Sequence, residues 1–369
     1  MNKLEELARL GQSVWLDFIS RKLLTSGELI RYREMGVSGM TSNPTIFDKA
    51  ISKSSDYDED IRHFLSKGLS VEDIYEKVIL KDIGIAADEM RKVYDETDGL
   101  DGYVSIEVVP LFAKNTKETI NQAKHLFQTL KRPNIMIKIP GTDEGLPAIT
   151  EVLGSGVNVN VTLIFSTEMY RKVIDAFMSG LEKYDAAGGD ISKHDSVASF
   201  FVSRVDTEVD KQLEAKKNKS LLGKIAVANS KIAYEISEEM FNSERWEKLA
   251  SKGARKQRLL WASTSTKNPN YSDVLYVDEL IGKDTVNTLP PETLQAFIDH
   301  GKAELTLDRG LDEAKEQLSE LKSLGIDINK ITEKLLEDGI KSFTDSFRSL
   351  MGSLNEKINK INEKIGSKT

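Results

Sequence analysis

Residues 133–142 read Pro133-Asn134-Ile135-Met136-Ile137-Lys138-Ile139-Pro140-Gly141-Thr142. The run is apolar and rich in β-branched residues, and it has a proline near each end, which predicts a short buried strand. Alternate side chains of a strand lie on opposite faces, so Ile135, Ile137 and Ile139 share a face that suits packing against helices. The other face carries Met136 and Lys138, which places one ammonium group near the end of an apolar segment.

Lys138 is therefore the first candidate for a functional side chain, because a lysine is rarely tolerated in such a segment without a reason. If the face is enclosed, burial disfavours the charged form. A neutral amine in that position can attack a carbonyl carbon and form a Schiff base. The alternative is a structural lysine whose stem covers apolar surface while its ammonium reaches solvent. The stretch alone favours the structural alternative, and the choice depends on the rest of the chain.

The composition restricts the classes of protein to which the chain can belong. Its 369 residues suffice for one large domain or two ordinary ones, and 39% hydrophobic with 30% charged residues is typical of a soluble globular protein. A net charge of -8 argues against a surface built for nucleic acid or an anionic membrane. A phosphate-bearing ligand must then be held by a few local cations.

Cysteine is absent, which excludes disulfides, thiolate metal sites and cysteine nucleophiles. The histidines at 63, 125, 194 and 300 lie too far apart for metal-ligand spacing. The amino terminus lacks the apolar region of a signal peptide, and no apolar run is long enough to span a bilayer. We therefore expect a cytoplasmic protein that needs no metal.

Eight segments read as strands: 12–20, 37–44, 102–110, 133–142, 157–165, 196–203, 258–265 and 285–290. Helical segments alternate with them, at about 3–10, 25–34, 44–99, 116–131, 143–153, 166–182, 204–215, 224–241 and from 311 onward. This alternation predicts parallel strands joined by helical crossovers. Eight such units favour an α/β fold with a single closed (β/α)8 TIM barrel.

The alternative architecture is an open doubly wound sheet. Against it, no strand-to-helix turn carries the glycine-rich phosphate loop that such sheets use. We expect one barrel domain over residues 1–369, with a helical insertion at about 48–100 and a carboxyl-terminal helical extension at about 311–369. Glycines at 325 and 339 are expected to break that extension.

Polar residues recur near the predicted carboxyl ends of the strands, where the active site of a TIM barrel lies. They are Asp17, Asn43, Glu107, Lys138, Asn160, Thr162, Ser199, Arg204, Ser263 and Lys267. Each alone has a structural explanation, such as a helix cap, an edge charge or a hydrogen-bonding core amide. Burying all of them around one pore costs several kcal/mol unless they satisfy one another or a ligand. The joint pattern favours a functional site.

Several of these residues lie in recognisable motifs. They are Asp17, Thr41-Ser42-Asn43-Pro44, Ser105-Ile106-Glu107-Val108, Ile137-Lys138-Ile139-Pro140, Asn160-Val161-Thr162-Leu163, Ser199-Phe200-Phe201-Val202-Ser203-Arg204 and Trp261-Ala262-Ser263-Thr264. In kind and order the set resembles the motifs of transaldolases, over about residues 10–300, and the chain length resembles the longer bacterial type.

The resemblance implies a barrel enzyme of the pentose phosphate pathway that needs no cofactor and no metal. It would convert sedoheptulose 7-phosphate and glyceraldehyde 3-phosphate into erythrose 4-phosphate and fructose 6-phosphate by moving a dihydroxyacetone unit. Its partners would be small sugar phosphates, without nucleic acid or membrane, and the protein would be a monomer or homodimer.

The resemblance also implies roles for residues. Lys138 would be the Schiff-base nucleophile, and Glu107 would act through a water as general acid and base, with Thr162 and Asn160 positioning that water. Asp17 would take the proton from the C4 hydroxyl as the carbon–carbon bond breaks. The remaining implied roles concern binding: Asn43 and Asn160 hold the dihydroxyacetone hydroxyls beside Ser199, Phe201 shapes the pocket, and Arg204 and Ser263 bind the phosphate.

Two departures from the shorter transaldolases stand out. Phe200 and Ser203 replace a usual proline and glycine, and no arginine follows Ser263 closely to act as the second phosphate cation. Lys267 is our substitute, because Ser263, Ser265 and Lys267 would share a face if the strand continued. The alternative for Lys267 is a solvated loop lysine.

Two other functions stay open at this stage. One is a Schiff-base aldolase that acts on fructose 6-phosphate and releases free dihydroxyacetone, and the other is a catalytically silent barrel that binds sugar phosphates. The fold alone does not decide between them. The helices from about 326 to 365 carry no predicted site residue and are interpreted as a flank or a lid.

Overall fold

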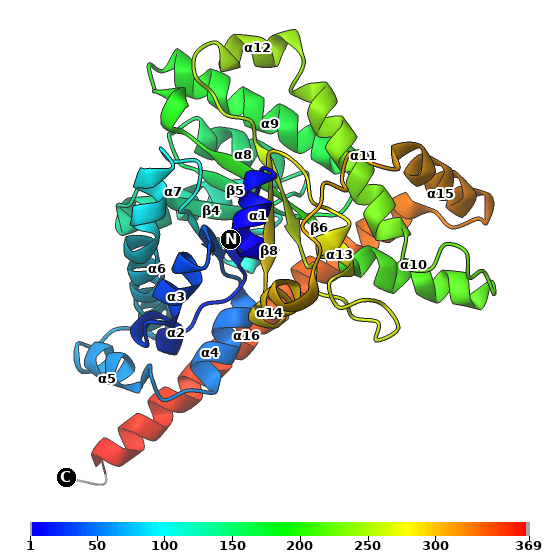
Figure 1. Cartoon of the computed structure of the whole chain (residues 1–369). Coiled ribbons are helices and arrows are strands. Elements are labelled where there is room, and N and C mark those ends of the chain that lie inside the picture. Colours follow the sequence, from blue (N-terminus) through cyan, green and yellow to red (C-terminus); the bar gives the residue numbers. More distant parts are fainter. Residues whose placement is uncertain (1, 367–369) are drawn as a thin grey trace.

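The computed structural model describes residues 2–366, and eight parallel strands close into a barrel in sequence order, with β1 also pairing with β8 (Figure 1). The strands are β1 (Gln12–Leu16), β2 (Gly39–Thr41), β3 (Val104–Glu107), β4 (Ile135–Pro140), β5 (Val159–Ile164), β6 (Ser196–Phe201), β7 (Arg258–Ala262) and β8 (Thr285–Leu289). The predicted TIM barrel is confirmed. Each expected segment contains one strand, which is shorter than the predicted range.

Helices surround the barrel (Figure 1). They are α1 (Lys3–Arg9), α2 (Arg21–Thr25), α3 (Glu28–Glu34), α4 (Pro44–Ser52), α5 (Asp58–Ser66), α6 (Val71–Glu96), α7 (Thr116–Leu130), α8 (Gly145–Leu153), α9 (Thr167–Ala186), α10 (Ser203–Ala215), α11 (Ile225–Met240), α12 (Glu244–Ala250), α13 (Leu275–Asp278), α14 (Pro291–His300), α15 (Leu311–Ser323) and α16 (Ile328–Gly366), with short 3-10 turns η1 (Pro110–Phe112) and η2 (Ile191–Lys193). None of the described helices is both long and apolar enough to cross a bilayer.

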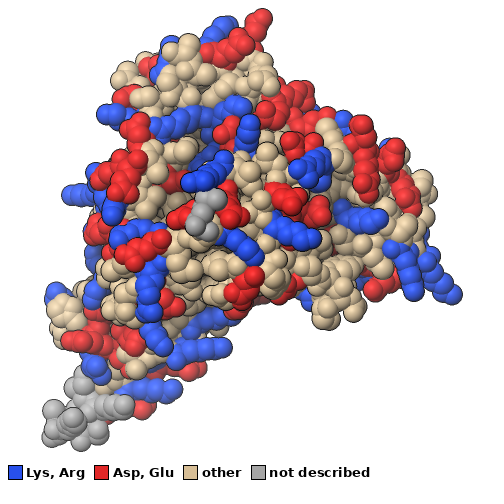
Figure 2. Space-filling model, in the orientation of Figure 1, with Lys and Arg blue, Asp and Glu red and all other residues tan. Residues whose placement is uncertain are grey.

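Register and close packing set the barrel interior. Glu107 of β3 pairs with Lys138 of β4, and Lys138 pairs with Asn160 of β5, so these three side chains lie in one row. Gly39 of β2 allows a close approach, because a Cβ there would lie 2.6 Å from the ring of Trp15. Acidic and basic side chains are intermingled on the outer face shown in Figure 2.

One expectation about local structure needs correction. The helix predicted over 25–34 is α3, which begins only at Glu28 because Gly27, at φ +79°, precedes it. A separate helix that was not predicted, α2, is capped by Ser20 and ends at Thr25. β5 is irregular at Leu163, whose φ of +58° accompanies a shift in pairing with β6. The side chain of Leu163 lies against Gly339 of α16.

Helix α16 is 39 residues long and passes over the carboxyl ends of the strands alongside α4 (Figure 1). The predicted break at Gly339 does not occur, and Gly339 instead permits a close contact: a Cβ there would lie 3.0 Å from Leu163 and 3.6 Å from Arg204. The Thr45 and Ser346 hydroxyls, 2.8 Å apart, join α4 to α16. The predicted break at Gly325 is confirmed, since it lies between α15 and α16.

Candidate active site

The row across β3, β4 and β5 places Lys138 at the centre of the site. Lys138 is only 5% exposed, its Nζ donates to the carbonyl of Ser42 at 3.1 Å, and it lies 3.8 Å from Oε2 of Glu107. The solvated alternative for Lys138 is therefore wrong, because both neighbouring strands enclose it. One hydrogen bond to a carbonyl leaves the amine further capacity to interact with a ligand.

Glu107 is buried, and neither of its carboxylate oxygens has a hydrogen-bond partner among the described residues. Burial raises the pKa of Glu107 to about 7, with Lys138 opposing the rise and Asp17 adding to it. The hydroxyl of Thr162 is also buried and without a partner in the described part of the chain. A carboxyl with a pKa near neutrality can both give and take a proton at physiological pH.

Asp17 follows β1 directly, and its amide donates to the carbonyl of Leu289 at 2.8 Å, which fixes the backbone across the β1–β8 seam. Its Oδ1 accepts a hydrogen bond of 2.6 Å from the hydroxyl of Thr41, which lies 2.7 Å from the hydroxyl of Thr288. Burial raises the pKa of Asp17, and Lys138 and Thr41 lower it. Thr41 was not among the predicted site residues, although it lies in the Thr41-Ser42-Asn43-Pro44 motif.

The amide of Asn160 is oriented by two hydrogen bonds. Its nitrogen donates to Oγ of Ser105 at 3.0 Å, and its oxygen accepts from Ser199 at 2.7 Å. Asn43 caps α4, because its side-chain oxygen accepts from the amide of Ile46 at 3.0 Å. Asn43 also lines the cavity at this end of the barrel.

A cavity of about 720 Å³ opens at the carboxyl ends of the strands. Of the predicted site residues, its walls include Asp17, Asn43, Lys138, Ser199, Phe201, Arg204, Ser263 and Lys267. Glu107, Asn160 and Thr162 do not line it and are buried beside Lys138 in the barrel. The structure thus brings the predicted residues together in two layers: an outer layer that lines the cavity, and an inner layer of Glu107, Asn160 and Thr162 buried beside Lys138.

The cavity walls also include residues that the sequence did not single out. Among them are Lys22, Lys49, Glu292, Ser342 and Phe343. Ser342 and Phe343 belong to α16, so the helix interpreted as a flank or lid forms part of the cavity. No sequence signal links α16 to the site, because its apolar face indicates burial but not the surface that it covers.

Arg204 and Lys267 lie at the outer end of the cavity. The guanidinium of Arg204 lies 5.2 Å from the ring centroid of Phe201, and burial lowers its pKa while Asp338 opposes that effect. Lys267 Nζ donates to Oγ of Ser265 at 2.7 Å, and its pKa is lowered by burial and by Arg204. The condition on which Lys267 would share a face with Ser263 and Ser265 is not met, since β7 ends at Ala262 and Ser263 has a φ of +55°. Lys267 nevertheless lines the cavity.

Two tyrosines hold the segment that follows Lys267 against α10. Tyr271 donates to Asp210 at 2.7 Å, and Tyr276 donates to Asp206 at 2.9 Å. Both aspartates lie on the helix whose first turn carries Arg204. The two cations therefore stand on elements that are tied to each other.

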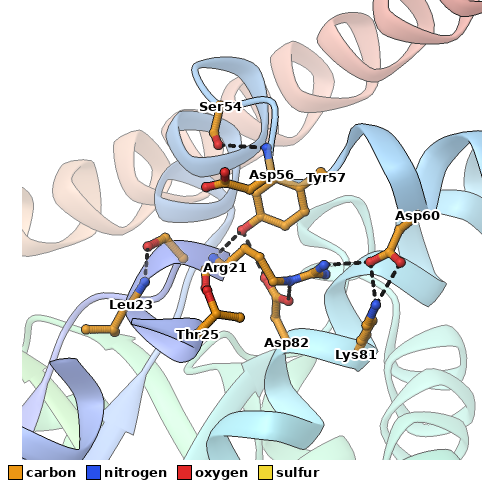
Figure 3. Close-up of polar contacts among 10 residues, drawn as sticks. Arg21, Leu23, Thr25, Ser54, Asp56, Tyr57, Asp60, Lys81 and Asp82 are labelled. Atoms are coloured by element: carbon orange, nitrogen blue, oxygen red, sulfur yellow. Dashed lines mark hydrogen bonds and ion pairs between the residues drawn. The ribbon is translucent and has the colours of Figure 1, made fainter. Parts of the chain in front are cut away.

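A second polar cluster supports the segment after Asp17. Arg21 bonds Asp82 and Asp60 at 2.6 Å each, and Tyr57 donates to Asp82 at 2.9 Å (Figure 3). Lys81 completes the cluster by donating to Asp60 at 2.7 Å. The cluster joins α2 to α5 and α6, so the helical insertion fixes the element that follows β1.

Within the described chain, no group of His, Asp or Glu side chains is arranged to hold a metal ion.

The chain was compared with known proteins. The family model described as Transaldolase/Fructose-6-phosphate aldolase matches residues 14–354. A protein named Transaldolase 2 from Nostoc sp. is 49% identical over 96% of this chain and 97% of its own length. Proteins named Transaldolase from Trichodesmium erythraeum and Thermobifida fusca are each 48% identical, over 96% and 94% of this chain and 97% and 96% of their own lengths.

Proposed function

The chain belongs to the transaldolase family, and from that premise we propose which of its side chains carry out each step. The activity is the transfer of a dihydroxyacetone unit between sugar phosphates through a lysine Schiff base, within the pentose phosphate pathway. The observation that carries the assignment is the enclosed amine of Lys138 beside a buried, unpartnered carboxyl group at 3.8 Å.

Lys138 attacks the carbonyl carbon of the ketose phosphate and forms a carbinolamine, which loses water to give an iminium ion. The iminium accepts the electron pair of the C3–C4 bond as that bond breaks. The aldose phosphate leaves, and the three-carbon unit stays on Lys138 as an enamine. Addition of the enamine to a second aldose phosphate and hydrolysis of the new imine complete the transfer.

Glu107 moves the protons of carbinolamine formation and dehydration. Its pKa of about 7 suits a group that must donate and accept in turn. The 3.8 Å separation from Lys138 exceeds direct hydrogen-bond reach, so the proton passes through a water, which the free hydroxyl of Thr162 helps to position. The side chain of Asn160 supports this water from the next position of the row.

Asp17 takes the proton of the C4 hydroxyl during cleavage. It lines the cavity with Lys138, and burial raises its pKa toward the range of a useful base. Asn43, Asn160 and Ser199 bind the hydroxyl groups of the three-carbon unit, and Phe201 shapes the pocket around it. Arg204, Ser263 and Lys267 bind the phosphate, because cations and hydroxyl donors suit phosphate oxygens.

The insertion and the carboxyl-terminal extension belong to the same single domain in this proposal. The contact of α4 with α16 and the presence of Ser342 and Phe343 in the cavity wall support it. A cytoplasmic location and the absence of macromolecular partners are part of the same proposal.

The test is to trap the covalent intermediate. Fructose 6-phosphate alone should leave a dihydroxyacetone unit on the enzyme, and borohydride should reduce it to a stable amine that peptide mass spectrometry places on Lys138. Erythrose 4-phosphate added first should discharge the adduct and yield sedoheptulose 7-phosphate. Lys231→Met, at another largely buried lysine, is the matched control and should label normally.

The alternatives give different results. Continuous release of free dihydroxyacetone without an acceptor would indicate an aldolase, and a complete lack of adduct would indicate a silent binding protein. Label on any other lysine would contradict the role of Lys138. In Asp17→Ala the trapped mass should shift to the whole hexose phosphate, because imine formation survives while cleavage is slow.

A further inference from the structure

We infer that Lys49 is a further phosphate-binding residue of this site and acts with Arg204 and Lys267 on the substrate's terminal phosphate. The inference deepens the proposed function and rests on it. Lys49 lies in the last turn of α4, within the helical insertion, and nothing in the sequence associates it with phosphate binding.

The first support is position. Lys49, Arg204 and Lys267 all line the active-site cavity, and they come from three different elements: α4, α10 and the segment after β7. Lys49 is close enough to contribute to the electrostatic environment of Lys267, where its charge, like that of Arg204, favours loss of the lysine proton. Three cations from three elements therefore line one cavity, and Lys49 and Arg204 both act on Lys267; Lys22 lines the cavity as well.

The second support is the lack of compensating carboxylates. In the described chain no carboxylate oxygen lies within 4.0 Å of a side-chain nitrogen of Lys49, Arg204 or Lys267, although carboxylates outnumber basic groups in the sequence. The neighbouring lysines of α16 are paired, Lys334 with Asp338 at 2.8 Å and Lys341 with Asp345 at 2.5 Å.

Grouping cations without counter-charges costs free energy, which a bound anion recovers. Glu292 lines the same cavity and favours the charged form of Lys267, and Asp338 does so for Arg204, yet neither carboxylate makes an ion pair with these cations. A phosphate dianion has the charge and the number of oxygens to engage three cations at once.

The third support is that the position of α4 is fixed from both sides. Asn43 caps its first turn next to the catalytic layer, and Thr45 bonds Ser346 of α16. Lys49 thus projects from a helix anchored to the barrel and to α16. Because its side chain is exposed, its contribution should be smaller than that of Arg204 and should weaken with salt.

The experiment compares Lys49→Met with Lys49→Arg and with Lys53→Met, which removes an exposed lysine at the end of the same helix that does not line the cavity. Lys49→Met should raise KM for fructose 6-phosphate about 3- to 10-fold at low salt and leave kcat unchanged. Inhibition by inorganic phosphate should weaken to a similar extent. Lys49→Arg should restore most of the affinity, and Lys53→Met should behave as wild type.

When unphosphorylated fructose is the donor, at high concentration, its KM should be the same in Lys49→Met as in the wild type. The inference would be overturned if Lys49→Met left both KM for fructose 6-phosphate and inhibition by phosphate unchanged. It would also be overturned if KM rose equally for fructose 6-phosphate and for fructose. Borohydride trapping on Lys138 separates this outcome from failure of the proposed function. If the adduct forms but Lys49→Met leaves KM for fructose 6-phosphate and inhibition by phosphate unchanged, only the role of Lys49 is contradicted. If the wild type forms no adduct, the proposed function itself is contradicted.

Discussion

Two clusters of charged side chains, which follow β1 at Asp17 and at Arg21, differ in how many of their charges have a close partner. In the cluster of Arg21, Asp60, Lys81 and Asp82, cations and carboxylates meet at 2.6 to 2.7 Å (Figure 3). In the cluster of Asp17, Glu107 and Lys138, the one ion pair measures 3.8 Å and the carboxylate of Glu107 has no hydrogen bond in the described structure. The first is a closed cluster and the second an open cluster.

The difference separates a structural role from a chemical one. Burial of ions is tolerated when partners satisfy them, and the ion pairs of the closed cluster fix α2, α5 and α6, with Nη2 of Arg21 the one buried nitrogen there that has no partner among the described residues. Burial raises the pKa of Asp82 in this cluster, but the charge of Arg21 and hydrogen bonds from Arg21 and Tyr57 oppose the rise. In the open cluster burial raises the pKa of Glu107 to about 7, and only the charge of Lys138 opposes the rise. Residue types alone do not distinguish the two clusters, because both contain carboxylates beside cations.

Replacement of a group in the open cluster should reduce activity strongly. Glu107→Gln removes the proton donor for dehydration of the carbinolamine, so imine formation should slow roughly 10²- to 10⁴-fold. Pre-steady-state trapping with borohydride measures this step directly. Normal imine formation with slow cleavage would reassign the roles of Glu107 and Asp17.

The same variant should change how stability depends on pH. Because burial raises the pKa of Glu107 from 4.5 to about 7, the native state keeps a proton between these values that the unfolded chain has lost. The free energy of unfolding should therefore fall as pH rises through this window. Glu107→Gln should lack this part of the fall, as urea titrations at several pH values would show.

Replacement of a group in the closed cluster should reduce stability instead. Asp82→Ala leaves the guanidinium of Arg21 and the hydroxyl of Tyr57 short of a partner and should cost about 3–5 kcal/mol of unfolding free energy. The control is Asp88→Ala on the same helix, whose exposed pair with Arg132 should be worth less than about 1 kcal/mol. Similar losses in both variants would remove the distinction between the clusters.

Arg204→Ala tests the outer end of the cavity. Loss of a charge-assisted contact of roughly 1.5–3 kcal/mol should raise KM for fructose 6-phosphate by about 10- to 150-fold. Stability should change little, because Arg204 makes no ion pair among the described residues. If KM for unphosphorylated fructose rose as much as KM for fructose 6-phosphate, Arg204 would not bind the phosphate.

Lys267→Ala should have the smallest effect of the four. Lys267 is exposed as a residue and its ammonium already donates to Ser265, so KM for phosphorylated donors should rise only about 2- to 5-fold. The effect should shrink as salt is added. A salt-independent loss would indicate that Lys267 shapes its loop rather than attracts phosphate.

The barrel and the inner residues of the site could be predicted because their signals are local. A lysine, a carboxylate or an amide in an apolar β-branched strand is conspicuous, and parallel strands bring such residues to one end. The left-handed conformation of Leu163 had no such signal, since a non-glycine residue adopts it only where tertiary contacts hold it there.

The position of α16 over the cavity could not be predicted from the sequence for a similar reason. Helical periodicity identifies an apolar face but not its distant partner. The low helix propensity of glycine predicts a helix break at Gly339, whereas its missing side chain leaves room for Leu163 and Arg204 to approach α16. Lys49 and Phe343 line the cavity because α4 and α16, which carry them, pack against each other.

The contacts that α16 makes with α4 and α5 also bear on how the protein reaches its native state. The Thr45–Ser346 contact joins residues 301 positions apart, and the contact of Lys357 with Asp58 spans 299. Contacts of such separation close a very long loop and slow the conformational search. A chain emerging from the ribosome presents all eight strands before α16, so the barrel can form while its cavity still lacks one wall. Substrate turnover should then recover later in refolding than secondary structure does, because the docking of α16 completes the cavity.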